Sequence, residues 1–221
     1  MSTTTAYSAP ISSGATTRRI GVKTLLEWGG VVAGAILIVF GVVSIVMSVN
    51  GRSTVRDSLK AEQIVGSADM TPAGIKAEAT KAGLTGITFP TKSVAGLAIT
   101  TGERARTFAE YMRIHALEAT GGYTYSQMGM YLAVPTAPKA QLMPGGGTDS
   151  TQYALIDPKT KQPVANGARN VWVTETALTT ALNSSYMAES LALFGMVVGF
   201  ALLLSGIGFE ILALATFRRR A

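Results

Sequence analysis

The residues of this sequence that could do chemistry are few. The single histidine, His115, stands three residues before Glu118, a spacing that places two metal ligands side by side on a helix. One imidazole and one carboxylate make half of a zinc site at most, because catalytic zinc takes three protein ligands. We therefore predict a surface His/Glu pair, with no bound metal and no cofactor.

Other catalytic groups are missing or incomplete in the sequence. The chain has no cysteine, which excludes disulfides, thiolate metal sites and cysteine nucleophiles. Its serines lack the GxSxG motif and a second plausible base. The glycine run at 145–147 is not followed by GK[ST] and opens no helix, so it is not a phosphate-binding loop. We predict that this protein is not an enzyme.

One short stretch combines three tyrosines with two methionines, and it is the best candidate for a recognition surface. Aromatic side chains are routinely buried, which favours core packing with the tyrosine hydroxyls in water. The alternative is a binding surface, because Tyr and Met are enriched at protein interfaces. The residues of this stretch are Tyr123, Tyr125, Met128, Met130 and Tyr131.

The elements that must position these residues are framed by two apolar stretches. Residues 28–49 carry no charge, and residues 191–217 are interrupted only by Glu210. At ~1.5 Å per residue, each stretch is long enough to cross a ~30 Å hydrocarbon core. We predict transmembrane helices at 25–49 and 186–217. A cleaved signal peptide is the alternative for the first, and its apolar stretch exceeds the roughly 7–15 residues of a signal core.

Charges next to the spans predict the orientation. Arg18, Arg19 and Lys23 precede the first span, and the arginines of residues 218–221 follow the second. Basic residues close to spans stay inside, so we expect both termini in the cytoplasm and the central domain outside a plasma membrane. The remaining segments are then a disordered tail (1–24), an extracytoplasmic domain (50–185) and a basic cytoplasmic end (218–221).

The net charge of +6 does not indicate a nucleic-acid partner. Residues 52–185 hold 13 Lys and Arg against 10 Asp and Glu, so about half of the surplus flanks the spans. No basic stripe with interleaved aromatic residues occurs in the middle of the chain. We expect a lipid bilayer as the first partner and no nucleic acid.

Small residues in the spans suggest close helix packing. Small side chains at helical spacing let two helix backbones pack closely, and lipid chains cannot provide equivalent packing. They fit either the seam of an antiparallel two-helix hairpin or a contact with a partner's span. Glu210 is a functional candidate by its position, although near the cytoplasmic end it can also snorkel or pair with an arginine. The packing candidates are Gly30, Gly34, Gly41, Gly199 and Gly206.

The domain between the spans is expected to be mainly helical with a few short strands. Its predicted helices and strands follow from capping residues, periodicity and glycine or proline breaks. A further helical pattern runs without a break from residue 174 to 217 and would join the domain to the second span. The predicted segments are helices at 53–65, 72–83 and 102–120, strands at 85–89 and 153–157, extended chain at 123–134 and 171–173, and a loop at 135–150.

Three segments together resemble a group of small two-span membrane proteins from high-GC Gram-positive, actinobacterial-type bacteria. The segments read TGERARTFAEYMRIHALEATGGYTY, DPKTKQPVANGAR and NVWVTETALTTALNSSYMAES, and the resemblance covers most of residues 50–210. It implies a domain outside a bacterial plasma membrane and no particular chemistry. Some members carry the label of aromatic ring-opening dioxygenases, which this sequence does not support, because such an iron site needs two histidines and a carboxylate.

The sequence favours a non-catalytic, membrane-anchored scaffold or accessory subunit. Its outer domain would be presented to a membrane complex or an envelope component, or to another copy of the chain. An extracytoplasmic sensor or ligand-binding module is the alternative, and it leaves only short cytoplasmic parts to receive a signal. An enzyme acting at the membrane surface would need further polar residues around His115 or Glu118.

Overall fold

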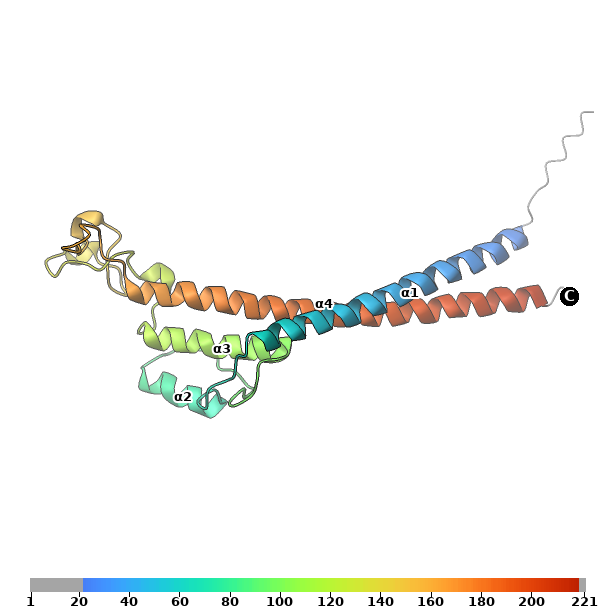
Figure 1. Cartoon of the computed structure of the whole chain (residues 1–221), viewed down its shortest axis with the longest axis horizontal. Helices are drawn as coiled ribbons and strands as arrows, with labels where there is room; N and C mark the ends of the chain where they lie inside the picture. Colours follow the sequence, from blue (N-terminus) through green and yellow to red (C-terminus); the bar gives the residue numbers. More distant parts are fainter. Residues whose placement is uncertain (1–21, 219–221) are drawn as a thin grey trace, which may run out of the picture. The chain divides into compact units, whose positions relative to one another are not determined.

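The computed structural model describes residues 22–218 (Figure 1). Most of the predicted tail (1–24) and of the basic end (218–221) lies outside the described residues. The described chain divides into two compact units. One contains residues 22–42 and 200–218, and the other contains residues 43–199. The described chain is mainly helical, as predicted.

Two helices are long and apolar enough to cross a membrane. They are α1 (Val22–Ala61) and α4 (Gly167–Arg218), and the candidate spans lie in Trp28–Ala61 and Gly167–Thr216. Only 11% of the most apolar window of each helix is buried, whereas a core helix of a soluble protein would be mostly buried. Large apolar side chains such as Met47 are exposed instead, which suits contact with lipid.

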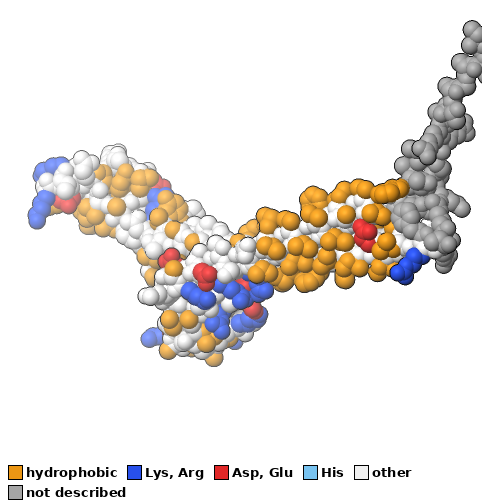
Figure 2. All heavy atoms as spheres, turned by 45° about the vertical axis from the view of Figure 1, so that its right-hand side comes forward, with side chains coloured by type: hydrophobic (Ala, Val, Ile, Leu, Met, Phe, Trp, Pro, Cys, Tyr) orange, Lys and Arg blue, Asp and Glu red, His pale blue; other side chains and the backbone are white. Residues whose placement is uncertain are grey.

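In the unit of residues 22–42 and 200–218, α1 and α4 meet at small residues. A Cβ atom on Gly34 would lie 3.0 Å from the backbone oxygen of Gly206. One on Gly30 would lie 3.7 Å from the Cβ atom of Ala213. The absence of side chains at these glycines lets the two backbones approach. Apolar side chains cover the outer surface of the apolar helical segments (Figure 2).

In the unit of residues 43–199, two shorter helices begin where the sequence predicts. Helix α2 (Pro72–Lys81) has Thr71 as its N-cap, whose hydroxyl accepts a hydrogen bond from the backbone of Gly74. Helix α3 (Gly102–Ala119) is capped in the same way by Thr101. Both helices confirm predicted elements, with ends one to two residues earlier than expected.

The core of this unit forms between its helices. In Figure 1, α3 lies between α4 and α2. Apolar side chains from all four helices and from the chain between α2 and α3 fill the space around α3. The buried members of this cluster are Leu59, Met70, Ile75, Ala79, Val94, Ile99, Ala105, Phe108, Ala109, Tyr111, Ile114 and Leu182.

Residues 123–166, which we call the loop head, contain short turns and single bridges. The predicted extended chain at 123–134 contains the 3-10 turn η1 (Tyr125–Gln127). The turn η3 (Thr151–Tyr153) ends at the first residue of the predicted strand at 153–157, and η2 (Lys139–Gln141) lies within the predicted loop. Isolated antiparallel bridges then join the segments, for example Tyr131 with Thr148. The turn before Thr148 contains two glycines with positive φ, Gly146 and Gly147.

Two other predictions of extended structure are wrong. Residues 85–89 form no strand, because no neighbouring segment of the described chain pairs with them. Residues 171–173 are helical, since α4 already begins at Gly167. Valine and tryptophan favour strands only weakly, and the burial of Trp172 against α3 overrides that preference.

Candidate functional site

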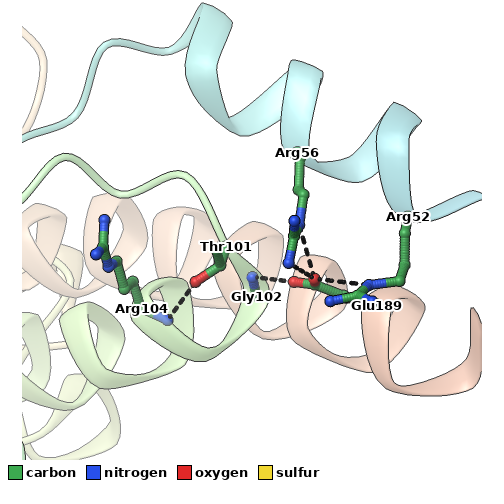
Figure 3. A network of polar contacts seen from close by, with 6 residues as sticks. All are labelled: Arg52, Arg56, Thr101, Gly102, Arg104 and Glu189. Carbon is green, nitrogen blue, oxygen red and sulfur yellow. Dashed lines mark hydrogen bonds and ion pairs between the residues drawn. The ribbon is translucent and has the colours of Figure 1, made fainter. Parts of the chain in front are cut away.

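One carboxylate joins three helices of the 43–199 unit. Glu189 of α4 forms ion pairs with Arg52 at 3.2 Å and Arg56 at 2.9 Å, both from α1. Its second oxygen accepts a hydrogen bond of 2.6 Å from the backbone N–H of Gly102. Figure 3 shows these groups converging on Glu189. We call Glu189, Arg52, Arg56 and Gly102 the Glu189 hub.

The position of the carboxylate is electrostatically favourable. Gly102 is the first residue of α3, where unpaired backbone N–H groups and the helix dipole attract negative charge. The Glu189 side chain is only 12% exposed, so its contacts are screened less than those of a surface pair. The hub therefore ties α1, α3 and α4 together through one side chain.

Close backbone packing accompanies the hub. A Cβ atom on Gly102 would lie 2.7 Å from the Cα atom of Tyr186 and 3.0 Å from the backbone oxygen of Ser185. Only glycine fits at this crossing of α3 and α4. Next to it, the guanidinium of Arg106 stacks over the Tyr186 ring at 4.8 Å, which adds a cation–π contact between the same helices.

A cavity of about 530 Å³ lies beside the hub. Most of its lining side chains are charged or polar, including Lys92, Glu103 and Glu110. Lys92, which precedes α3, forms an ion pair with Glu103 in the first turn of α3. The cavity is therefore suited to polar groups rather than to an apolar ligand.

The five tyrosines and methionines of the predicted recognition stretch divide into buried and exposed residues. Met128 is buried and Tyr131 is half-buried, so both belong to the packing of the loop head. Tyr123, Tyr125 and Met130 are exposed. Further exposed apolar side chains of the loop head are Leu132, Leu142, Leu155 and Ile156.

The loop head is attached to α3 and α4 through Trp172. Its indole N–H donates to the backbone oxygen of Tyr123 at 2.8 Å and lies 3.2 Å from the hydroxyl of Thr120. Arg169, one turn earlier on α4, stacks over the Tyr125 ring at 4.1 Å. These contacts fix the position of the exposed tyrosines on the helices beneath them.

His115 lies among three carboxylates. Its Nδ1 atom is 3.2 Å from Glu118 and 3.9 Å from Glu78, and its Nε2 atom is 3.1 Å from Asp69. Glu118 follows on α3, Glu78 comes from α2, and Asp69 precedes α2. The sequence predicted only the pair of His115 and Glu118, and the packing of α2 on α3 brings the other two to it.

These carboxylates are only partly satisfied. Ser67 hydrogen-bonds to Asp69 and, with the nearby His115, holds the pKa of that carboxyl below its usual range. The Oε1 atom of Glu118 is buried and has no hydrogen-bond partner. An unpaired buried polar atom costs about 1–3 kcal/mol, and more when it is charged.

The span residues singled out in the sequence have defined surroundings. The Oε1 atom of Glu210 lies 2.9 Å from where a Cβ atom on Gly34 would stand, so its carboxylate covers the contact of α1 with α4. Gly41 and Gly199 fall in different units, and their pairing stays a prediction. The choice between a hairpin seam and a partner's span also stays open.

The hub itself was not among the predicted site residues. Glu189 stands just before the apolar part of α4, and Arg52 and Arg56 follow the apolar part of α1. The sequence signal for the hub was an acidic residue just before one apolar stretch and two basic residues shortly after the other. Comparisons of the chain with protein-family models, curated proteins and solved structures found no match.

Proposed function

We propose that this chain is a membrane-anchored, non-catalytic scaffold or accessory subunit. Its domain of residues 50–185 faces the outside of a plasma membrane and contacts another membrane or envelope protein. The Glu189 hub is the observation that carries this proposal. A domain that presents a surface to a partner must be held firmly on its supporting helices, and the hub binds three of them at one point.

The loop head is the contact surface in this proposal. Tyr125 and Met130 are 45% and 48% exposed, respectively, and Leu155 and Ile156 add apolar surface in the same segment. Tyr and Met are enriched where proteins meet, because they offer large contact area with few polar groups to desolvate. The attachment through Trp172 and Arg169 keeps this surface ordered before a partner binds, which lowers the entropy cost of association.

A sensor or ligand-binding module is the second candidate. The cavity of about 530 Å³ beside the hub is the observation that favours it, because it is large enough for a small polar molecule. Arg52 and Arg56 on its wall are already paired with Glu189, which leaves less positive charge for a ligand. The scaffold proposal is therefore the stronger of the two.

The membrane arrangement can be tested by single-cysteine labelling, because the chain has no cysteine of its own. Ser126→Cys places a thiol in the loop head, and Ser13→Cys places one in the N-terminal tail. A membrane-impermeant maleimide applied to intact cells is expected to label the first variant only. Labelling of Ser13→Cys alone would mean that the orientation is reversed, and labelling of neither before lysis would mean that the domain is not exported.

The partner surface can be tested by site-specific photo-crosslinking in cells. A photoreactive residue at Met130 or Tyr125 is expected to give a discrete adduct with another membrane or envelope protein, identified by mass spectrometry. The same residue at Glu62, which is exposed after α1, is the matched control. If the loop-head positions gave no adduct, or only the adducts seen at Glu62, the loop head would not be a contact surface.

A further inference from the structure

The Glu189 hub lies where the two apolar stretches of the chain end. Arg52 follows the charge-free residues 28–49 by three positions, and Glu189 precedes the apolar residues 191–217 by two. At ~1.5 Å per residue, Arg52 is about 4.5 Å beyond the last of those uncharged residues. The headgroup layer is about 5–8 Å thick on each side of the hydrocarbon core, so Arg52 lies at headgroup level when α1 crosses a membrane.

We propose that the cavity of about 530 Å³ beside the hub binds the headgroup phosphate of one anionic phospholipid, with Arg52 as its main contact. This inference rests on the membrane anchoring in the proposed function. It depends neither on the scaffold role nor on the side of the membrane that the domain faces.

The surroundings of the two hub arginines match the order of groups in a phospholipid. The cavity beside the hub is lined by Arg52 and Arg56, and also by Leu193 from the apolar stretch of α4. A second cavity of about 340 Å³ shares both arginines and adds Val49 and Met196 from the two apolar stretches. A phospholipid with its acyl chains along these apolar side chains brings its phosphate to the arginines.

The charges that line the larger cavity leave one positive charge in excess. Four basic side chains stand against three carboxylates. Lys92 pairs with Glu103, and Arg106 pairs with Glu110. The carboxylate of Glu189 then carries one negative charge between the two arginines of the hub. The phosphodiester of a lipid headgroup also carries a single negative charge, so one such group balances the excess.

Arg52 keeps hydrogen-bond donors for that phosphate. A guanidinium carries five N–H donors, and Arg52 donates to Glu189 through its Nε atom at 3.2 Å. Its side chain forms no other hydrogen bond with a described residue. The terminal amino groups can therefore make the charge-assisted contacts that arginine forms with phosphate. Arg56 directs both Nε and Nη2 at Glu189, so it acts as a positioning residue for that carboxylate.

The excess charge also indicates the class of headgroup. In phosphatidylglycerol the phosphate is the only charged group. In phosphatidylcholine a quaternary ammonium lies next to the phosphate and cancels most of the attraction to the excess positive charge. Basic pockets beside membrane-spanning helices bind anionic headgroups for this reason.

The test is a lipid titration of the full chain in detergent micelles, followed by native mass spectrometry and by the melting temperature. Phosphatidylglycerol is expected to bind as one molecule per chain and to raise the melting temperature, because it binds the folded state. Phosphatidylcholine should bind about fivefold more weakly or less, as expected for the loss of one unit of attraction at a membrane surface. Glycerophosphoglycerol, the same headgroup without acyl chains, distinguishes a lipid from a soluble phosphodiester and should give no comparable shift.

Variants show whether the lipid uses the cavity. Arg52→Gln removes the excess charge and the terminal donors, and it should weaken binding of phosphatidylglycerol by about tenfold or more. Because Arg52 also holds Glu189, a second variant leaves the hub intact. Ser190 is exposed in the cavity lining, and the carboxylate of Ser190→Asp would compete with the phosphate for Arg52 and weaken binding as well. Arg218→Gln removes an exposed arginine at the other end of the apolar stretch and is the matched control, which should bind as the unchanged chain does.

Three results would overturn the proposal. Equal binding of phosphatidylglycerol by the unchanged chain and by folded Arg52→Gln and Ser190→Asp would mean that lipid does not use the cavity. Equal binding of phosphatidylcholine would remove the role of the excess charge. Binding of glycerophosphoglycerol as tight as that of the lipid would identify a soluble ligand. Loss of the loop-head crosslinks with selective phosphatidylglycerol binding retained would instead support this site and overturn only the scaffold role.

Discussion

The carboxylate of Glu189 lies at the first turn of α3 and accepts a hydrogen bond of 2.6 Å from the backbone N–H of Gly102. The two residues are 87 positions apart in the chain, and the same carboxylate also pairs with Arg52 and Arg56. One side chain thus satisfies a helix terminus and two arginines.

Removing the carboxylate should loosen the junction of the three helices. We expect Glu189→Ala to lower the free energy of unfolding by about 1–3 kcal/mol, because a charge-assisted hydrogen bond and two ion pairs are lost together. Glu189→Gln keeps an oxygen for Gly102 and should cost less. Urea unfolding of the chain in micelles measures both. Glu110→Ala, which breaks an exposed pair with Arg106, is the control and should change little.

A side chain at position 102 should separate α3 from α4. Gly102→Ala places a Cβ atom 2.7 Å from the Cα atom of Tyr186, where backbone rather than a flexible side chain must move. We expect destabilisation of about 1–3 kcal/mol, typical of overpacking. Gly167→Ala meets nothing within 4 Å and is the control. Equal melting temperatures for the two variants would contradict the close approach.

Alkaline pH should destabilise the domain through Tyr111. Burial raises the pKa of this phenol, whose hydroxyl donates to the backbone oxygen of Lys92 at 2.9 Å. The folded state therefore keeps the phenolic proton to higher pH than the unfolded state, in which the tyrosine pKa is about 10. The contribution of Tyr111 to the free energy of unfolding is fully present below the unfolded-state pKa, and it is lost as pH rises through the pKa of the folded state. Melting curves at increasing pH should show a steeper fall for the unchanged chain than for Tyr111→Phe.

The contact of α1 with α4 in the apolar unit should not tolerate a large side chain. We expect Gly34→Leu to destabilise this unit by about 1–3 kcal/mol, because the new side chain would meet Glu210 and the backbone of Gly206. Gly29→Leu, with nothing within 4 Å, adds the same side chain as a control. Thermal unfolding followed by circular dichroism in micelles compares them. If both variants melted alike, the two helices would not meet at Gly34.

Much of the helical framework followed from local signals in the sequence. The start of α2 follows from Thr71 as a cap and Pro72 in the first turn, because a cap acts on backbone groups within one turn. The start of α3 at Gly102 follows from the periodicity of its apolar face. The two apolar stretches likewise needed only length and composition to be recognised as candidate spans. Orientation, the extracytoplasmic location and the scaffold role remain predictions.

The candidate sites were decided by tertiary packing. Asp69 and Glu78 lie more than 35 positions before His115, and only the packing of α2 on α3 brings their carboxylates to its ring. In the same way, burial of Trp172 made residues 171–173 helical against their strand propensity. By itself, the sequence determined which segments are apolar and where α2 and α3 start, because those properties depend on neighbouring residues. Which charged groups meet depends on long-range contacts, and these exist only in the folded chain.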